Sequence, residues 1–383
     1  MFVDLTAEQR RFRNELRSYL ADLVTPEERA EMAANGYGNA YRAVVRRMGG
    51  DGWLGVGWPK EYGGQGFGPV EQQILFNEAA YADVPLPLVT LLTICPTLQA
   101  HGTERQKKRF LPGILAGDIH FAIGYCEPET GTDLAALQTD AVRDATGDWI
   151  VNGQKVFTTG ANVADFVWLA CRTGTTKSGH RGLTILIVDT TDPGYSWAST
   201  ILCDGERYTD ITSFENVRVP GDMLVGKVNG GWKLITTQLD HELVSLGASG
   251  NIKQLYDAVH TWALRQGVLG EADVRRSLGR LYALVRLNEL LNWQVAATWG
   301  PGSSAGISVD APATKVFFTE ALEEAGRIAE EIVGCYGDPA DPKTANLLVR
   351  LDLRTKENLI ATIGGGIPYL PDSGEIHRLA CLP

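Results

Sequence analysis

Apolar residues recur at helical spacing in the first third of the chain. Four of them are separated by three or four positions, and these are Phe12, Leu16, Leu20 and Leu23. Thr6 and Gln9 precede them in the pattern of a capping box, in which the two residues satisfy free N–H groups at a helix start. Further helical patterns cover residues 70–82 and 103–115, whereas the glycine-rich stretch 51–68 predicts a structured loop.

The period changes over residues 119–226. Short runs of branched and aromatic residues replace the helical spacing, at 149–157, 166–171, 183–188 and 214–220. Within the first run, Asn152-Gly153 has the composition of a tight turn between two strands. Several short strands at this spacing predict a compact sheet or barrel.

Helical patterns return in the last third of the chain. They cover 232–266, with interruptions at Gly247 and Gly250, and then 274–298 and 314–333, with a linker at 301–306. Helices on both sides of a block of strands predict an α+β fold with segregated layers, because alternating βαβ units would mix the two patterns along the chain.

Charge narrows the classes of partner. The chain carries 35 Lys and Arg against 46 Asp and Glu, a formal net charge of −11. Nucleic acids and anionic membranes both require a basic face, so we expect neither as a partner. No stretch approaches the roughly 18 apolar residues of a membrane span, and the N-terminal residues lack the apolar core of a signal peptide. We therefore expect a cytoplasmic protein.

Cysteine and histidine usage excludes two further classes of site. The six cysteines are dispersed without a CxxC pair, which is typical of reduced cytoplasmic proteins. The six histidines are scattered without an HExxH motif, so the sequence predicts no metal site. A GxGxxG fingerprint is also absent, so any nucleotide or flavin is not held by a Rossmann motif.

One carboxylate lies within an apolar stripe. Ile235, Leu239 and Leu246 form one face of a predicted helix, and Glu242 is on the same face. Burial there favours the neutral carboxyl and raises its pKa, which suits a general base working near neutral pH. A buried ion pair with an arginine, or a position at the edge of the helix, is the alternative, and periodicity alone favours that alternative.

Two segments combine glycine with hydroxylated or aromatic residues, and a third is a run of three glycines. The first, Tyr125–Asp133, offers small and hydroxylated positions of the kind that bind phosphate through backbone N–H groups. The second, Gly153–Gly160, places Phe157 beside two threonines, and the third is Gly364–Gly366. Taken alone, each segment has an ordinary explanation: a turn for the first, which glycine-rich loops usually are, a half-buried strand for the second, and a helix end for the third.

Five motifs taken together resemble the acyl-CoA dehydrogenase family, and they occur in that family's order. They are GWPKEYGGQG (57–66), GTERQKKRFLPGILAGD (102–118), CEPETGTD (126–133), NGQKVFTTG (152–160) and FENVRVPGDMLVG (214–226). The resemblance implies an N-terminal helical domain (1–118), a middle β-domain (119–226) and a C-terminal four-helix domain (227–383) in a tetramer.

The resemblance also implies FAD-dependent α,β-desaturation of an acyl-CoA thioester. A carboxylate removes the α-proton while a hydride passes from the β-carbon to the flavin. The family has two positions for this base, and the one in the C-terminal loop is Gly365 here, which has no carboxylate. The other matches Glu242, so the family and the apolar stripe lead to the same residue. The backbone N–H of Gly365 would polarise the thioester carbonyl.

The family's flavin contacts map onto all three of these segments, the third of which is the C-terminal loop. Phe157 would stack on the ring where the family has tryptophan, and Thr159, beside Thr158, would reach flavin N5. Thr132 would also contact the substrate. The remaining cofactor contacts implied by the motifs are Tyr125, Cys126, Gly131 and Gly366.

Departures from the family suggest an incomplete flavin site. Leu243 follows Glu242 where an arginine is usual. The RxxFG stretch that reaches a neighbour's FAD is absent from 263–279, and QxxGGxG becomes EIVGCYG with Glu331 in place of glutamine. We therefore expect a heterotetramer (α2β2) in which a homologous acyl-CoA dehydrogenase subunit supplies the missing half-site.

Two sequence patterns, GYxEPExGTDL and TTQLxxExVxLG, narrow the resemblance further. They resemble the base-bearing subunit of the two-subunit acyl-CoA dehydrogenases of actinobacterial steroid side-chain catabolism. This implies a bulky steroid CoA thioester as substrate and an acceptor such as electron-transfer flavoprotein. Three alternatives remain: a general short- or branched-chain homotetramer, a non-catalytic structural subunit, and a flavin oxidase or monooxygenase on the same fold.

Overall fold

The computed structural model describes residues 4–131, 133–236, 238, 247–298 and 310–363. Within them the chain forms two compact units, each assembled from separate stretches of sequence. The helical unit is built from described residues within 4–23, 68–85 and 247–363, and the sheet unit from those within 24–67 and 86–238. Helices flank a block of strands along the chain, which confirms the predicted α+β fold.

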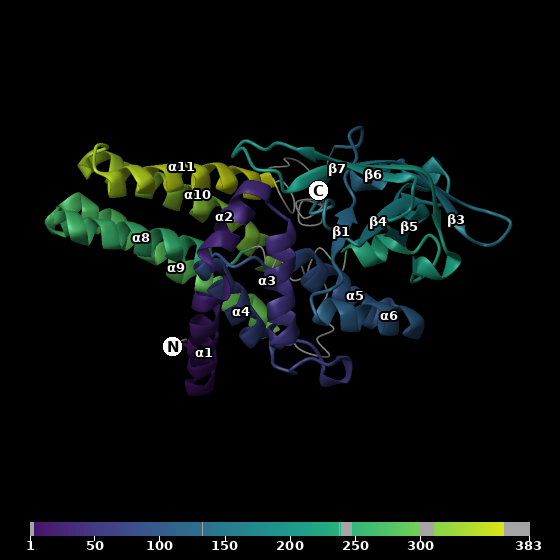
Figure 1. Ribbon diagram of the computed structural model, residues 1–383, viewed down its shortest axis with the longest axis horizontal. Helices are drawn as coiled ribbons and strands as arrows, with labels where there is room; N and C mark the ends of the chain where they lie inside the picture. Colours follow the sequence, from purple (N-terminus) through teal and green to yellow (C-terminus); the bar gives the residue numbers. More distant parts are fainter. Residues whose placement is uncertain (1–3, 132, 237, 239–246, 299–309, 364–383) are drawn as a thin grey trace. The chain divides into compact units, whose positions relative to one another are not determined.

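The helical unit combines both ends of the described chain. Its helices are α1 (Ala7–Leu23), α4 (Pro69–Ala82), α8 (Gly250–Gln266), α9 (Ala272–Thr298), α10 (Asp310–Tyr336) and α11 (Pro342–Ile363). Helices α8 to α11, green to yellow in Figure 1, pack against one another around a core of buried aliphatic side chains. The Trp262 indole of α8 donates to the Thr344 hydroxyl of α11 at 3.0 Å, so a buried polar group is satisfied within this core.

Helix α4 approaches α8 so closely that only glycine fits at the contact. A Cβ added to Gly250 would lie 2.0 Å from the Asn77 carbonyl oxygen. The amide oxygen of Asn77 also accepts from the Ser249 backbone N–H at 3.0 Å. Gly250 was predicted as an interruption of a longer helix, and in the structure it is the first residue of α8.

Local sequence rules account for the helix starts. Thr6 and Gln9 form the predicted capping box, with mutual bonds of 3.0 and 3.2 Å, and α1 follows it. In the sheet unit, Thr103 and Gln106 cap α6 in the same way. The predicted helices at 70–82 and 103–115 are confirmed.

The sheet unit carries further helices before its strands. They are α2 (Pro26–Asn35), α3 (Asn39–Gly50), a π-helical segment η3 (Val89–Ile94), α5 (Cys95–His101) and α6 (Glu104–Leu115). The predicted loop at 51–68 is confirmed, since its helical content is limited to two three-residue 3₁₀ turns.

The described strands form one mixed sheet in the order β6-β7-β3-β2-β4-β5-β8, with β1 paired to β4. Strand β1 runs parallel to β4, and most other pairs are antiparallel. The strands are β1 (Phe121–Gly124), β2 (Asp140–Arg143), β3 (Trp149–Thr159), β4 (Phe166–Arg172), β5 (Leu183–Asp189), β6 (Tyr195–Thr200), β7 (Thr209–Val219) and β8 (Leu224–Val225). The predicted compact sheet is therefore confirmed.

The predicted turn at Asn152-Gly153 is wrong. Both residues lie inside β3, which continues from Trp149 to Thr159. Gly153 is needed for close packing instead of a turn, because a Cβ there would lie 2.5 Å from the Thr139 hydroxyl. The Asn152 side chain accepts from the Asn216 backbone N–H at 2.8 Å, at an irregularity in the pairing of β3 with β7.

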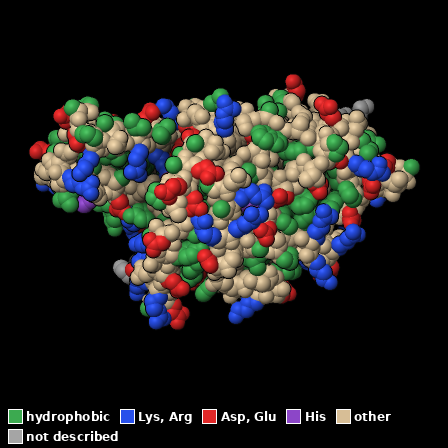
Figure 2. Space-filling model, viewed as in Figure 1, with side chains coloured by type: hydrophobic (Ala, Val, Ile, Leu, Met, Phe, Trp, Pro, Cys, Tyr) green, Lys and Arg blue, Asp and Glu red, His purple; other side chains and the backbone are tan. Residues whose placement is uncertain are grey.

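The surface charges are mixed. On the face drawn in Figure 2, Lys and Arg side chains are interspersed with Asp and Glu. Among the described helices, none is long and apolar enough to cross a membrane.

Candidate functional site

Four of the predicted site residues lie outside the described part of the chain. They are the candidate base Glu242, together with Thr132, Gly365 and Gly366. The predicted linker at 301–306 also lies outside it. The remaining candidates are all in the sheet unit, in the segment after β1 and at the end of β3.

The structure brings these two segments together. The Val156 backbone N–H donates to the Cys126 carbonyl oxygen at 2.9 Å. The Lys155 ammonium donates to the Tyr125 carbonyl oxygen at 3.1 Å and to a Glu127 carboxylate oxygen at 2.8 Å. Two motifs almost thirty residues apart in sequence therefore form one surface.

Phe157 is in an unusual backbone conformation at this surface. Its φ is +56°, a left-handed value that costs an L residue about 1–2 kcal/mol. The pairing of β3 with β7 shifts between Lys155 and Thr158, so an extra residue bulges from β3 at this point. The side chain is 65% exposed. An exposed aromatic ring on a strained backbone is typical of a ligand contact.

The bulge is held by a fully buried neighbour. Thr158 is 0% exposed, and its hydroxyl lies 3.3 Å from that of Thr212 on β7. Thr159 is half-buried and is paired with Thr209 in the sheet. Adjacent threonines thus have different roles, since one anchors the strand and the other remains partly accessible.

Gly131 lies in the turn region that follows Glu127. Its φ is +55°, and a Cβ there would meet nothing within 4 Å. The Thr130 N–H donates to the Glu127 carbonyl at 3.4 Å, and the Asp133 N–H to Thr130 at 3.1 Å. The segment is therefore an open turn, with Cys126 half-buried at its start.

Tyr125 connects this surface to the segment that precedes Glu242. The Tyr125 side chain is buried, and its hydroxyl donates to the amide oxygen of Gln238. Gln238 is also buried, and its amide nitrogen lies 3.5 Å from the Thr93 carbonyl oxygen. That Tyr125 lines the flavin site stays a prediction, and the bond from its hydroxyl to Gln238 fixes the side chain at this surface.

Sequence reasoning missed the roles of four buried polar residues at this site. Lys155 and Glu127 form an ion pair, and Gln238 bonds Tyr125. Asp210 on β7 accepts from the Ser199 hydroxyl at 2.9 Å and from the Asn162 N–H at 3.1 Å, and burial raises the pKa of its carboxyl. The available signal for the first pair was Lys155 itself, a lysine in a predicted strand, together with Glu127 in the preceding motif.

The donor set and the exposed ring fit a flat, polar cofactor such as a flavin. Phe157 offers an aromatic face, and Thr159, a half-buried residue two positions further along β3, carries a hydroxyl. Gly131 leaves room for close approach of a ligand to the backbone. Among the described residues, no group of three or more His, Cys, Asp or Glu side chains could hold a metal ion.

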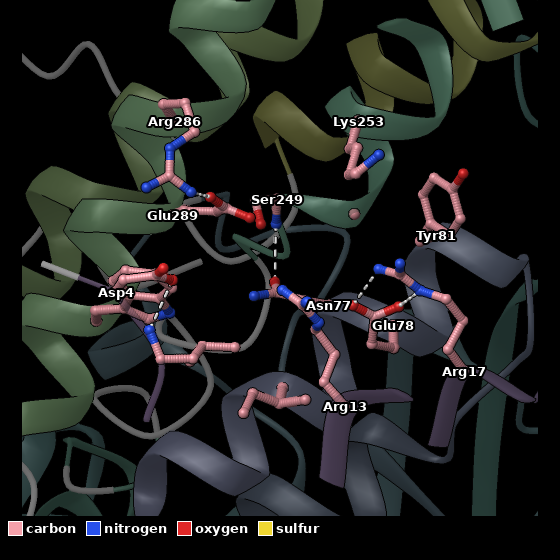
Figure 3. Close-up of a pocket in the computed structure, with 14 residues that line it drawn as sticks. Asp4, Arg13, Arg17, Asn77, Glu78, Tyr81, Ser249, Lys253, Arg286 and Glu289 are labelled. Atoms are coloured by element: carbon pink, nitrogen blue, oxygen red, sulfur yellow. Dashed lines mark hydrogen bonds and ion pairs between the residues drawn. The ribbon is translucent and has the colours of Figure 1, made fainter. Parts of the chain in front are cut away.

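A separate cavity of about 70 Å³ lies in the helical unit, between α1, α4, α8 and α9 (Figure 3). Four of its charged residues form two ion pairs with one another. Arg17 binds Glu78 through two bonds of 2.7 and 2.8 Å, and Arg286 binds Glu289. Burial raises the pKa of Glu289 even though Arg286 opposes this effect. Of the predicted site residues that the structure describes, none lines this cavity.

Three family models cover most of the chain. The N-terminal domain of acyl-CoA dehydrogenase matches residues 6–118, the middle domain matches 122–217, and the C-terminal domain matches 229–366. The resemblance drawn from the five motifs is therefore confirmed, and so is the acyl-CoA dehydrogenase-like fold.

Individual proteins are similar over nearly the whole length. Acyl-CoA dehydrogenase FadE29 of Mycobacterium tuberculosis is 61% identical over 96% of this chain and 95% of its own length. FadE26 of the same organism is 43% identical over 96% and 95%.

Two solved structures superpose on nearly the whole of this chain. The Tcur3481-Tcur3483 steroid ACAD superposes with a TM-score of 0.88 at 42% identity, covering 99% of this chain and 97% of that one. The ChsE4-ChsE5 complex of Mycobacterium tuberculosis superposes with a TM-score of 0.86 at 41% identity, also covering 99% and 97%. The chain therefore belongs to the acyl-CoA dehydrogenase family, a family of flavoprotein oxidoreductases.

Proposed function

We propose that this chain catalyses FAD-dependent α,β-dehydrogenation of a steroid side-chain CoA thioester, as the base-bearing subunit of a heterotetramer. A solved relative at 42% identity is described as a steroid ACAD, and another at 41% identity is a complex of ChsE4 with ChsE5. These descriptions support a steroid substrate and a heteromeric assembly for this chain.

The bond between Tyr125 and Gln238 is the observation that carries the proposal. Tyr125 belongs to the segment that contacts the Phe157 bulge, and Gln238 is four residues before Glu242 in the sequence. A base for this reaction must act close to the flavin, because the α-proton and the β-hydride leave from adjacent carbons. The anchor at Gln238 supports Glu242 as that base.

Each proposed residue has a distinct task. Glu242 would remove the α-proton of the thioester as general base. The Gly365 backbone N–H would donate to the thioester oxygen and stabilise the charge that develops there. Phe157, Thr158, Thr159, Tyr125, Cys126, Gly131, Thr132 and Gly366 would hold the cofactor, with Thr132 also toward the substrate. FAD, when bound, would supply the hydride acceptor.

The partner subunit is proposed from what this chain lacks. The RxxFG stretch is missing between α8 and α9, so this chain offers no such arginine to a neighbour's FAD. Glu331 replaces a glutamine in the same half-site, and its carboxylate pairs with Arg327 one turn earlier on α10. Because Arg327 offsets the charge of Glu331, the missing arginine motif is the stronger argument for a partner subunit. A homologous subunit would complete the site.

Two further parts of the proposal follow from the chemistry. The reduced flavin must pass its electrons to an acceptor, for which we propose a protein of the electron-transfer flavoprotein class. We also propose that the complex works in the cytoplasm, where thiols stay reduced; Cys95 and Cys171 are buried and free.

The test is to co-express this chain with a homologous subunit, count flavin, and assay a steroid side-chain CoA thioester with an artificial electron acceptor. We expect a complex with half as many FAD molecules as chains and desaturation of the steroid thioester. One FAD per chain in the isolated protein, with turnover of straight-chain thioesters, would instead establish a general homotetrameric dehydrogenase.

A further inference from the structure

A buried ion pair lies directly behind the surface proposed to face the flavin. Lys155 is 0% exposed and Glu127 is 6% exposed. Their ammonium and carboxylate are 2.8 Å apart. A buried pair of this kind gains little net stability over an apolar replacement, so its presence calls for another explanation.

Each partner also binds backbone from a different segment. Lys155 donates to the Tyr125 carbonyl at 3.1 Å. The Glu127 carboxylate accepts from the Gln138 N–H at 2.6 Å and from the Thr139 N–H at 2.8 Å. The pair therefore ties β3 to the segment after β1 and to the chain leading into β2.

The pair also defines where the strained bulge begins. Lys155 is in register with Thr212, and the register is next regular at Thr158. Lys155 and Thr158 are both fully buried, so Phe157 is fixed from both sides in its left-handed conformation. A strained conformation persists only where its surroundings hold it this firmly.

We propose that Lys155 and Glu127 are positioning residues, which hold the Phe157 bulge and the Tyr125–Cys126 segment in the geometry that binds flavin, although neither touches the cofactor. This inference rests on the proposed flavin function. It adds two residues to the site and assigns them an effect on the cofactor, transmitted through the backbone they bind.

Electrostatics supports a charged pair. Burial alone would raise the pKa of the Glu127 carboxyl, but the Lys155 ammonium and the hydrogen bonds from Thr139 and Gln138 keep this pKa below its ordinary value. Burial lowers the pKa of Lys155, and Glu127 opposes that shift. Removing either partner would leave the other buried without its counter-charge, which disturbs the backbone groups that both bind.

The test compares three variants in the co-expressed complex. Lys155→Met removes the cation and its bond to Tyr125, and Glu127→Gln removes the charge and leaves one amide oxygen in place of the two carboxylate oxygens that accept from the Gln138 and Thr139 N–H groups. Glu78→Gln is the matched control, because Glu78 is 7% exposed and pairs with Arg17 in the helical unit. FAD affinity, the flavin absorption spectrum, kcat, KM and the thermal unfolding midpoint are measured for each.

We expect both sheet-unit variants to shift the flavin absorption band and to weaken FAD binding by about tenfold, which corresponds to about 1.4 kcal/mol. We also expect kcat to fall by about 100-fold, since small misplacements have effects of that size. The control Glu78→Gln should lose about as much Tm as the two sheet-unit variants but keep the flavin spectrum and FAD affinity of the unmutated complex. A folded Lys155→Met or Glu127→Gln complex with unchanged spectrum and affinity overturns the proposal. Failure of the unmutated complex to bind FAD would instead refute the proposed function.

Discussion

The strained backbone at Phe157 makes an unusual stability prediction. At a regular strand position, glycine is less stable than alanine by about 0.5–1 kcal/mol because it loses more backbone entropy on folding. At φ +56° an L residue is disfavoured by about 1–2 kcal/mol, and glycine is not. We therefore expect Phe157→Gly to be more stable than Phe157→Ala by roughly 0.5–1 kcal/mol, the reverse of the usual order.

Loss of the ring cancels from this comparison, since both variants remove it. Gln154 is the matched control position, because it is exposed, lies on the same strand, and is not among the described residues with positive φ. There we expect Gln154→Ala to be more stable than Gln154→Gly by about 0.5–1 kcal/mol. The assay is urea unfolding of the flavin-free protein. If Phe157→Ala equals or exceeds Phe157→Gly in stability, the strain argument is refuted.

The same variants test the proposed role of the ring. Stacking of an aromatic side chain on a planar heterocycle is worth about 1–3 kcal/mol, so both variants should bind FAD roughly 5- to 150-fold more weakly. Phe157→Trp should retain most of the affinity. FAD affinity that is unchanged in Phe157→Ala would show that the ring makes no contact with the cofactor.

Three further predictions concern packing, pH and assembly. Gly250→Ala should destabilise the protein by more than about 2 kcal/mol because its Cβ would overlap the Asn77 carbonyl, whereas Gly279→Ala on α9, with open space around it, should stabilise the protein by up to about 1 kcal/mol in thermal unfolding. Burial is the main reason why the pKa of His120 is lowered from its ordinary 6.5 to about 4, so the folded state binds fewer protons than the unfolded state between these pH values. The free energy of unfolding should therefore fall by about 3 kcal/mol between pH 6.5 and 4. Unfolding measurements across this range check it, because the stability of His120→Gln should fall less steeply with pH than that of the unmutated protein. Restoring glutamine by Glu331→Gln in the chain expressed alone should not raise its FAD content to one per chain, since the arginine motif would still be missing; a full complement of FAD would contradict the heterotetramer.

The sequence predicted those parts of the fold that have local signals. Capping residues and apolar spacing located α1, α4 and α6, and runs of branched residues located β3, β4 and β5. Helix α11 was missed although it has local signals, since Asp341 accepts from the Thr344 N–H at its start and Pro342 is its first residue. Helix α3 has no side-chain cap at its start, so that signal was absent from its sequence. The division into two compact units, each drawing on distant stretches of sequence, has no local signature.

The candidate site was predictable only in part. Family motifs identified Cys126 and Phe157, and the structure joins their segments by a backbone bond. The Lys155–Glu127 pair could not be deduced from spacing, because the two residues meet only after β3 has paired in the sheet. Glycine at 153 was misassigned to a turn, since a close approach by Thr139 and a turn both select glycine.

The most direct measurement is the turnover of the Glu242→Gln variant in the co-expressed complex, with FAD content determined on the same sample. Glutamine keeps the size of the side chain but cannot accept the α-proton. The account predicts that steroid thioester desaturation is lost while the FAD content and absorption spectrum match those of the unmutated complex. Unchanged turnover at full FAD content would contradict it and show that this chain is a structural subunit whose partner bears the base.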